Sequence, residues 1–142
     1  MKTLSQILDT RAGIVAVGPA ESVHYALQIM AEHEVGAVLV MEGGRLIGIL
    51  SERDYARKVV LKGKLSHETR VYEIMAERVV CATLDTSMDE AMAIMTESHI
   101  RHLPVLDDLK DVAGVVSMRD LVEATIAEQT FVIRQLESYI TQ

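Results

Sequence analysis

Apolar residues recur at helical spacing in two separate segments of the chain. Each set occupies positions i, i+3, i+4 and i+7, which lie on one face of a helix. The first set is Val23, Ala26, Leu27 and Met30, and the second is Met88, Ala91, Met92 and Met95. The offset between the sets is 65 residues throughout, and a serine precedes each set as a candidate N-cap, Ser22 and Ser87. The pattern predicts two equivalent amphipathic helices.

Short apolar strands follow the same order around both helices. Each copy is expected to contain a helical turn, a strand, the amphipathic helix, a hairpin of two strands and a final helix. The expected strands are 14–17, 37–41 and 46–51 in the first copy, and 79–82, 102–106 and 112–117 in the second. The third strands align with an offset of 66, so the second hairpin contains one additional residue. We therefore expect an α/β (α+β) fold of two repeats, each β-α-β-β-α.

A polar linker and an unrepeated tail complete the chain. The expected domains are 4–62 and 71–125, with a linker at 63–70. Residues 126–142 have no counterpart in the first copy and are expected to form a C-terminal helical extension. Apolar residues recur there at spacings near 3.6, at Ile126, Val132, Ile133, Leu136 and Ile140. Such a stripe needs a cover, so the tail predicts a homodimer.

Composition and charge narrow the function classes. The chain has 142 residues and a net charge of −7, so its field repels nucleic-acid phosphates and anionic membranes. We see neither a secretory signal nor an apolar run long enough to span a bilayer. The single cysteine, Cys81, suits a reducing cytoplasm and is interpreted as apolar filler. His99 and His102 lack further ligands at metal-binding spacing, and no catalytic constellation can be assembled, so neither a metal centre nor an enzyme is expected.

Candidate chemistry lies where each third strand runs into a helix. The two junctions are Gly48-Ile49-Leu50-Ser51-Glu52-Arg53-Asp54 and Gly114-Val115-Val116-Ser117-Met118-Arg119-Asp120. Ser-x-x-Asp at such a place can simply cap the helix and complement its dipole. The same geometry can make a nucleoside site, because a carboxylate can accept hydrogen bonds from both ribose hydroxyls and N–H groups at a helix start attract phosphate. The residues alone leave both interpretations open.

The duplicated unit that ends in Gly-h-h-Ser-x-Arg-Asp, where h is apolar, resembles the CBS domain. The resemblance covers nearly the whole chain and implies a tandem CBS-domain pair, or Bateman module, with pseudo-twofold repeats and an extended C-terminal helix. It also implies a regulatory module that binds an adenine nucleotide, AMP or NAD(H), in the cleft between repeats and signals to a partner protein by conformational change. Homodimers are usual among such modules. A structural homodimeric interaction protein with vestigial nucleotide sites is the alternative.

A basic pair, Arg101-His102, opens the middle strand of the second copy, where the first copy has Gly36-Ala37. In one member of the family that the chain resembles, a basic pair at this place contacts nucleotide phosphates, which implies that the two sites are unequal. Two solvated residues at a strand end are the simpler interpretation. The ligand-binding residues predicted in this way are Ser51, Arg53, Asp54, Arg57, Arg101, His102, Pro104, Ser117, Arg119 and Asp120.

Overall fold

The computed structural model describes residues 2–8 and 13–141 and divides into two compact units. The first unit is Gly13–Val79, and the second unit is Val80–Gln142 together with Met1–Ala12. Each unit holds one three-stranded sheet and its own hydrophobic core. The expected α+β fold of two repeats with a C-terminal helix is confirmed.

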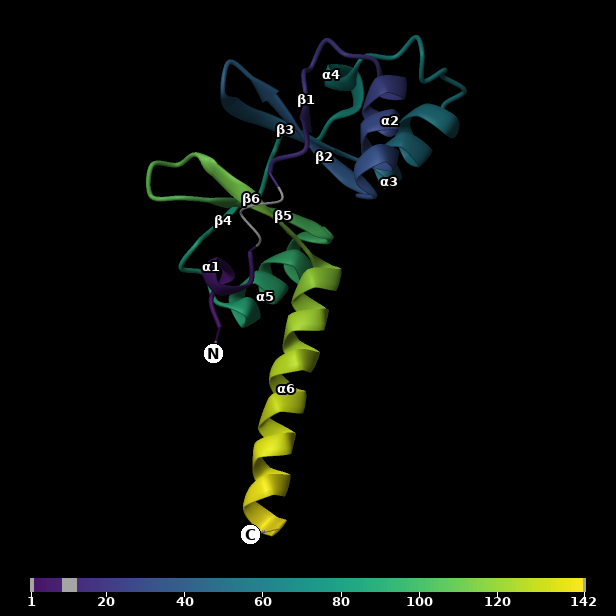
Figure 1. Cartoon of the computed structure of the whole chain (residues 1–142). Coiled ribbons are helices and arrows are strands. Elements are labelled where there is room, and N and C mark those ends of the chain that lie inside the picture. The colour runs from purple at the N-terminus through teal and green to yellow at the C-terminus, as the bar shows by residue number, and fades with distance from the viewer. Residues whose placement is uncertain (1, 9–12, 142) are drawn as a thin grey trace. The chain divides into compact units, whose positions relative to one another are not determined.

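In the first unit the sheet has the order β1-β2-β3. Its strands are β1 (Ala16–Val17), β2 (Ala37–Glu42) and β3 (Arg45–Ser51). β1 runs parallel to β2, and β2 is antiparallel to β3 with a register shift at Val40/Met41. Figure 1 shows α2 (Val23–His33) and α3 (Glu52–Tyr55) together on one side of this sheet. The hairpin between β2 and β3 turns through Gly43 and Gly44, which both have positive φ.

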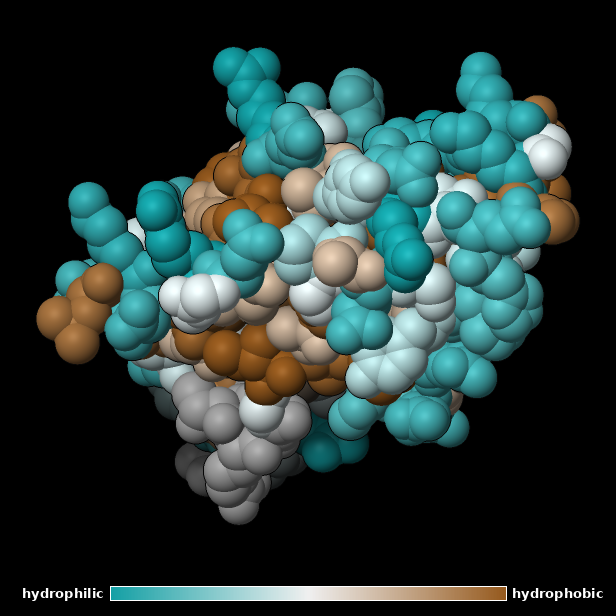
Figure 2. Space-filling model, turned by 90° about the horizontal axis from the view of Figure 1, so that it is seen from above, coloured by the Kyte–Doolittle hydropathy of each residue, from teal (hydrophilic) through white to brown (hydrophobic). Residues whose placement is uncertain are grey.

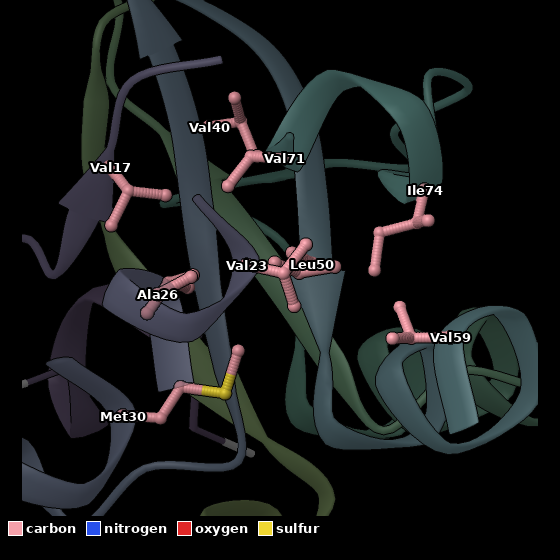
Figure 3. Close-up of a cluster of buried hydrophobic side chains, with 10 residues drawn as sticks. Val17, Val23, Ala26, Met30, Val40, Leu50, Val59, Val71 and Ile74 are labelled. Atoms are coloured by element: carbon pink, nitrogen blue, oxygen red, sulfur yellow. The ribbon is translucent and has the colours of Figure 1, made fainter. Parts of the chain in front are cut away.

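The apolar stripe of α2 faces the sheet as its spacing predicts. Ser22 Oγ accepts a hydrogen bond from the Tyr25 N–H at 3.1 Å, which confirms the expected N-cap. Val23, Ala26 and Met30 are buried and point toward side chains of β2 and β3 (Figure 3). The cluster of buried residues consists of Val17, Val23, Ala26, Met30, Val38, Val40, Leu50, Val59, Val71 and Ile74.

The polar linker is packed against the start of α2. The Val23 N–H donates to the Thr69 carbonyl at 2.8 Å, and the His24 N–H donates to the Ser66 carbonyl at 3.1 Å. Thr69 itself is buried. The first N–H groups of a helix have no partner inside the helix, so these linker carbonyls satisfy donors that α2 would otherwise leave to water.

The second unit repeats the first in order and direction. Its sheet is β4-β5-β6, formed by β4 (Ala82–Thr83), β5 (His102–Leu106) and β6 (Val112–Ser117). The register shift recurs at Val105/Leu106, 65 residues after the shift in the first sheet. α5 (Met88–Ser98) packs on the sheet, and Ser87 caps it by accepting from the Glu90 N–H at 3.1 Å. The buried residues are Leu4, Ala82, Met88, Ala91, Met95, Leu103, Val105, Val116 and Leu121.

The two short helices that precede the repeats are exchanged between the units. α1 (Leu4–Ile7) packs in the second unit, where its backbone donates from Leu4 to Thr86 at 2.8 Å. α4 (Val71–Ile74) packs in the first unit, and Ala76 just after it exchanges two backbone hydrogen bonds with Ile49. The boundaries of the packed units therefore differ from the expected domains 4–62 and 71–125. A repeat in the sequence shows which segments are equivalent, but it does not show which sheet each segment covers.

Equivalent glycines allow these exchanged segments to approach the third strands. A Cβ atom built on Gly48 in β3 would lie 2.7 Å from Met75 Sδ and 3.1 Å from the Ala76 carbonyl oxygen. A Cβ on Gly114 in β6 would lie 2.9 Å from Leu8 Cδ1. The 2.7 Å and 2.9 Å distances are shorter than a methyl group tolerates, so the neighbouring side chain would have to move, and glycine avoids this where the segment crosses the strand.

The last helix, α6 (Met118–Thr141), confirms the expected extension of the final repeat. Figure 1 shows it continuing in yellow well beyond the rest of its own unit. Among its described residues Leu121 is the buried one. The exposed large apolar residues of α6 are Val122, Ile126, Phe131, Val132, Ile133, Leu136, Tyr139 and Ile140. In the first unit the corresponding helix is short, since α3 passes into a π-helical segment, η2 (Ala56–Val60).

The face shown in Figure 2 carries apolar surface interspersed with hydrophilic residues. Across the described part of the chain, no helix combines the length and the apolar character that a membrane span requires.

Candidate functional site

The first junction joins β3 to α3 through a reciprocal cap. The Ser51 N–H donates to Asp54 Oδ2 at 2.9 Å, and the Ser51 hydroxyl contacts the same oxygen at 3.0 Å. In return the Asp54 N–H donates to Ser51 Oγ at 3.2 Å. This is a capping box with aspartate in the third helical position, and it fixes the carboxylate beside the strand end.

The second junction, between β6 and α6, has the same backbone geometry. The Ser117 N–H donates to Asp120 Oδ2 at 2.9 Å, and the Asp120 N–H donates to Ser117 Oγ at 3.0 Å. The capping role weighed from the sequence is therefore present in both copies. A cap uses one carboxylate oxygen, so a ligand role depends on what contacts the other oxygen.

The two carboxylates differ in that respect. Asp54 Oδ1 lies 3.3 Å from Lys58 Nζ, and the same ammonium group donates to the Ile74 carbonyl at 3.0 Å. The residue equivalent to Lys58 in the second unit is Ala124. Asp120 is exposed, and no residue that the structure describes donates to its Oδ1. Both oxygens of Asp54 are thus occupied, whereas Asp120 keeps one oxygen for an external donor.

Backbone N–H groups at the two helix starts are largely in use. The Glu52 N–H donates to the Gly36 carbonyl at 3.0 Å, and the Met118 N–H donates to the Arg101 carbonyl at 2.9 Å. These matching bonds confirm that Gly36 and Arg101 occupy equivalent places. They also occupy the first backbone donor of each helix, so an anion placed there would depend more on side-chain donors.

The basic pair of the second copy lies beside the second junction. His102 and Ser117 are register partners across β5 and β6, which places the pair at the strand ends that lead into the second junction. The Arg101 guanidinium is exposed and forms no ion pair with any residue in the described ranges 2–8 and 13–141. His102 is half-buried. In the first unit the partner of Ser51 is Ala37, so no cation stands at that place.

The other predicted arginines lie on exposed helix surfaces. Arg119 donates to Glu123 Oε1 at 3.0 Å, but both side chains are more than half exposed, so the pair contributes little stability. Arg53 and Arg57 are exposed on α3 and η2 of the first unit. They lie close in sequence to Asp54, and the structure assigns them no ion pair among the described residues.

Pro104 acts through the backbone of β5. Its counterpart in the first unit, Leu39, donates its N–H to the Val15 carbonyl at 3.1 Å. Proline has no N–H, so the Val80 carbonyl lacks the hydrogen bond that Val15 receives. β4 begins at Ala82, later than the expected strand 79–82, and β1 likewise begins at Ala16, later than the expected strand 14–17. Val80 was not among the residues predicted from the sequence. The alignment of Pro104 with Leu39 indicates it, because the proline removes the donor that Val80 would otherwise meet.

Cys81 lies in the same short segment and is half-buried. Burial raises the pKa of its thiol, because desolvation disfavours the thiolate. A raised pKa is the opposite of what an activated nucleophile requires. Within residues 2–8 and 13–141, no three His, Cys, Asp or Glu side chains gather as a metal site would need.

A family model described as the CBS domain matches residues 4–61 and 71–127. The chain therefore belongs to the CBS-domain family and is a tandem CBS pair, a class of regulatory module. Residues Ser51, Asp54, Ser117 and Asp120 lie within the two matched segments.

Similar proteins include bacterial, plant and archaeal members. A CBS-domain protein from Burkholderia ambifaria superposes with a TM-score of 0.85 and 45% identity, covering 90% of this chain and 96% of that one. YhcV of Bacillus subtilis is 34% identical over 119 residues, which are 83% of this chain and 84% of YhcV. CBSX3 of Arabidopsis thaliana is 38% identical over 125 residues, which are 84% of this chain but 60% of CBSX3. The CBS pair of protein MJ0100, solved with 5′-methylthioadenosine and S-adenosyl-L-methionine, has a TM-score of 0.78 and 25% identity, covering 87% of this chain and 99% of that one.

Proposed function

We propose that this CBS pair is a regulatory sensor for an adenine nucleotide, AMP or NAD(H), and that the second unit holds the tighter site. The observation that carries the proposal is the contrast between the two junctions. Asp120 has a free oxygen beside Arg101 and His102, whereas both oxygens of Asp54 are occupied within the chain. The adenosine ligands of the MJ0100 pair support the choice of an adenosine compound.

Each group has a chemical role in this proposal. The free Asp120 oxygen accepts hydrogen bonds from the ribose hydroxyls, and the Ser117 hydroxyl is close enough to serve the ribose or the phosphate. Arg101 and His102 bind phosphate oxygens. The Val80 carbonyl, which Pro104 leaves without its strand partner, accepts from the exocyclic amine of adenine.

The first junction is proposed as a weaker site of the same kind. A ribose must compete with Lys58 for Asp54, and an exposed i,i+4 ion pair is worth about 0.3–0.5 kcal/mol. That competition alone lowers affinity by roughly twofold. The larger difference comes from the missing basic pair, so Arg53 and Arg57 are the cations left to meet a phosphate in this unit.

Signalling and location complete the proposal. Ligand binding shifts the population of conformations, and a partner protein reads that shift. The single cysteine, which cannot form a disulfide within the chain, suits a reducing cytoplasm. We assign no catalytic step, and steady-state turnover of ATP or NAD by the purified chain would contradict that assignment.

Native mass spectrometry of the purified chain tests the proposal by weighing any co-purifying ligand. Calorimetry with AMP, NAD, NADH, 5′-methylthioadenosine and GMP on ligand-free protein then ranks the candidates. We expect adenine compounds to bind and GMP to bind weakly. Absence of binding by every adenosine compound at millimolar concentration would favour the alternative, a structural interaction protein with vestigial sites.

A further inference from the structure

The exposed face of α6 repeats with a period shorter than that of a single amphipathic helix. Positions 122, 126, 129, 133, 136 and 140 are separated by alternating steps of four and three residues. Steps of four and three average 3.5 residues, which is the period of a left-handed coiled coil. Five of the six positions are aliphatic and exposed, with exposed fractions between 43% and 80%. The sixth is Gln129, which is also exposed.

We infer that α6 pairs with α6 of a second copy of this chain as a parallel, in-register, two-stranded coiled coil along residues 122–140. The residue types at the core positions favour two strands. Isoleucine occupies every a position, at Ile126, Ile133 and Ile140. The d positions are Val122, Gln129 and Leu136. Isoleucine at a with leucine at d favours a parallel dimer, and Leu136 is the d position that has this residue.

Gln129 distinguishes parallel from antiparallel pairing. In a parallel dimer Gln129 faces Gln129 of the second copy, and each side-chain amide can donate to and accept from the other. In the antiparallel register that aligns all six core layers, Gln129 would face Ile133. Its amide would then be buried without a partner, which carries a desolvation penalty. A single polar residue at an a position specifies register in coiled coils, and Gln129 would have the same effect from a d position.

The residues beside the core agree with this orientation. Parallel pairing places Thr125 opposite Thr130 and Val132 opposite Glu137, so no like charges meet. The antiparallel register would bring Glu123 of each copy alongside Glu137 of the other. Val132 and Tyr139, both at least half exposed, would lie along the parallel seam and cover it.

The coiled coil is short, so the dimer that it forms is expected to be weak. Six core positions fall below the three to four heptads typical of free-standing coiled coils. However, α6 is already nucleated by its first turns, where Leu121 is buried in the core of the second unit. We therefore expect a reversible dimer that dissociates on dilution.

Cysteine cross-linking tests the orientation in the full-length chain carrying Cys81→Ser. Leu136→Cys places a thiol at a d position, where parallel chains bring the two copies together, so oxidation should give a covalent dimer. Ser138→Cys is the matched control, because position 138 lies on the outer face of the same turn and should remain monomeric on a denaturing gel. Equal cross-linking of both variants would overturn the inference. So would preferential cross-linking between chains carrying Ile126→Cys and chains carrying Leu136→Cys, which meet only in an antiparallel pair.

Sedimentation equilibrium tests the surface itself. Ile133→Glu puts a charge into the core layer and should weaken self-association at least tenfold. Its thermal unfolding should remain that of the native chain at dilution, because residue 133 is exposed in one copy. A wild-type monomer at all concentrations, or a dimer that Ile133→Glu leaves intact, would refute the coiled coil. Nucleotide binding by the variant is expected to persist, so failure of this inference and failure of the nucleotide proposal are distinguishable.

Discussion

Replacing each junction aspartate by alanine should separate its structural role from its ligand role. Both carboxylates cap a helix, so both changes remove the hydrogen bond from the serine N–H. Loss of a partly solvent-exposed hydrogen bond of this kind costs about 0.5–1.5 kcal/mol of stability. Asp54→Ala also removes the contact with Lys58, which adds about 0.3–0.5 kcal/mol. We expect Asp54→Ala to be at least as destabilising as Asp120→Ala in chemical denaturation.

Binding should show the opposite order. A hydrogen bond from a ribose hydroxyl to a carboxylate is worth about 1.5–3 kcal/mol, which corresponds to roughly ten- to hundredfold in affinity. Asp120→Ala should therefore weaken AMP binding at the tighter site by that factor. Asp54→Ala should leave this site within about twofold of the wild type, because Asp54 contacts Ser51 and Lys58 within the first unit.

Calorimetry with AMP and 2′-deoxy-AMP on both variants provides the decisive comparison. The wild type should prefer AMP, and Asp120→Ala should lose most of that preference. Asp54→Ala serves as the matched control, since it removes the same kind of cap. If Asp120→Ala still discriminates between the two ligands as the wild type does, the carboxylate does not bind the ribose and is a cap alone.

Three further predictions concern Arg101, two glycines and Cys81. Arg101→Ala should weaken AMP much more than adenosine in calorimetry, because adenosine has no phosphate to lose; equal losses would make Arg101 structural. Gly48→Ala should lower stability by about 1–3 kcal/mol, and Gly114→Ala should cost less. The new methyl group meets the Met75 side chain and also the rigid Ala76 carbonyl in the first case, but only the end of the Leu8 side chain in the second; a reversed order by thermal denaturation would count against this packing. Burial raises the pKa of Cys81, so its alkylation by iodoacetamide near neutral pH should be slower than that of free cysteine. The alkylation rate should increase as the pH rises through that pKa. A rate faster than that of free cysteine would show an activated thiol.

The helices and strands of this fold can be predicted from the sequence because the same spacing of apolar residues occurs in both repeats. Ser22 and Ser87 cap the two amphipathic helices, and the strands 102–106 and 112–117 have the expected bounds. Non-local packing was not visible in the same pattern. Nothing in the residues of α1 indicates that it covers the second sheet, since the apolar positions of α1 and α4 are interchangeable in kind.

The residue types of the candidate site were predictable from the sequence, but which of their oxygen atoms already have partners within the chain was not. The Ser-x-x-Asp spacing located both junctions, whereas the contact between Lys58 and Asp54 depends on the helix geometry beyond the motif. Proline in a strand signals a missing donor, yet the acceptor it leaves, Val80, becomes identifiable only when the strands are paired. These are properties of partners distant in sequence, which spacing along one chain cannot report.

α6 begins immediately after Ser117, so a single uninterrupted helix carries Asp120 at one end and the heptad face along the rest of its length. If nucleotide binding changes the conformation of this helix, nucleotide binding and self-association are thermodynamically linked. Whatever factor a nucleotide applies to the self-association constant, self-association must apply to the nucleotide affinity in return. A sensor built on this helix would thus respond to the abundance of its own chain as well as to its ligand, and its apparent nucleotide affinity would drift with protein concentration.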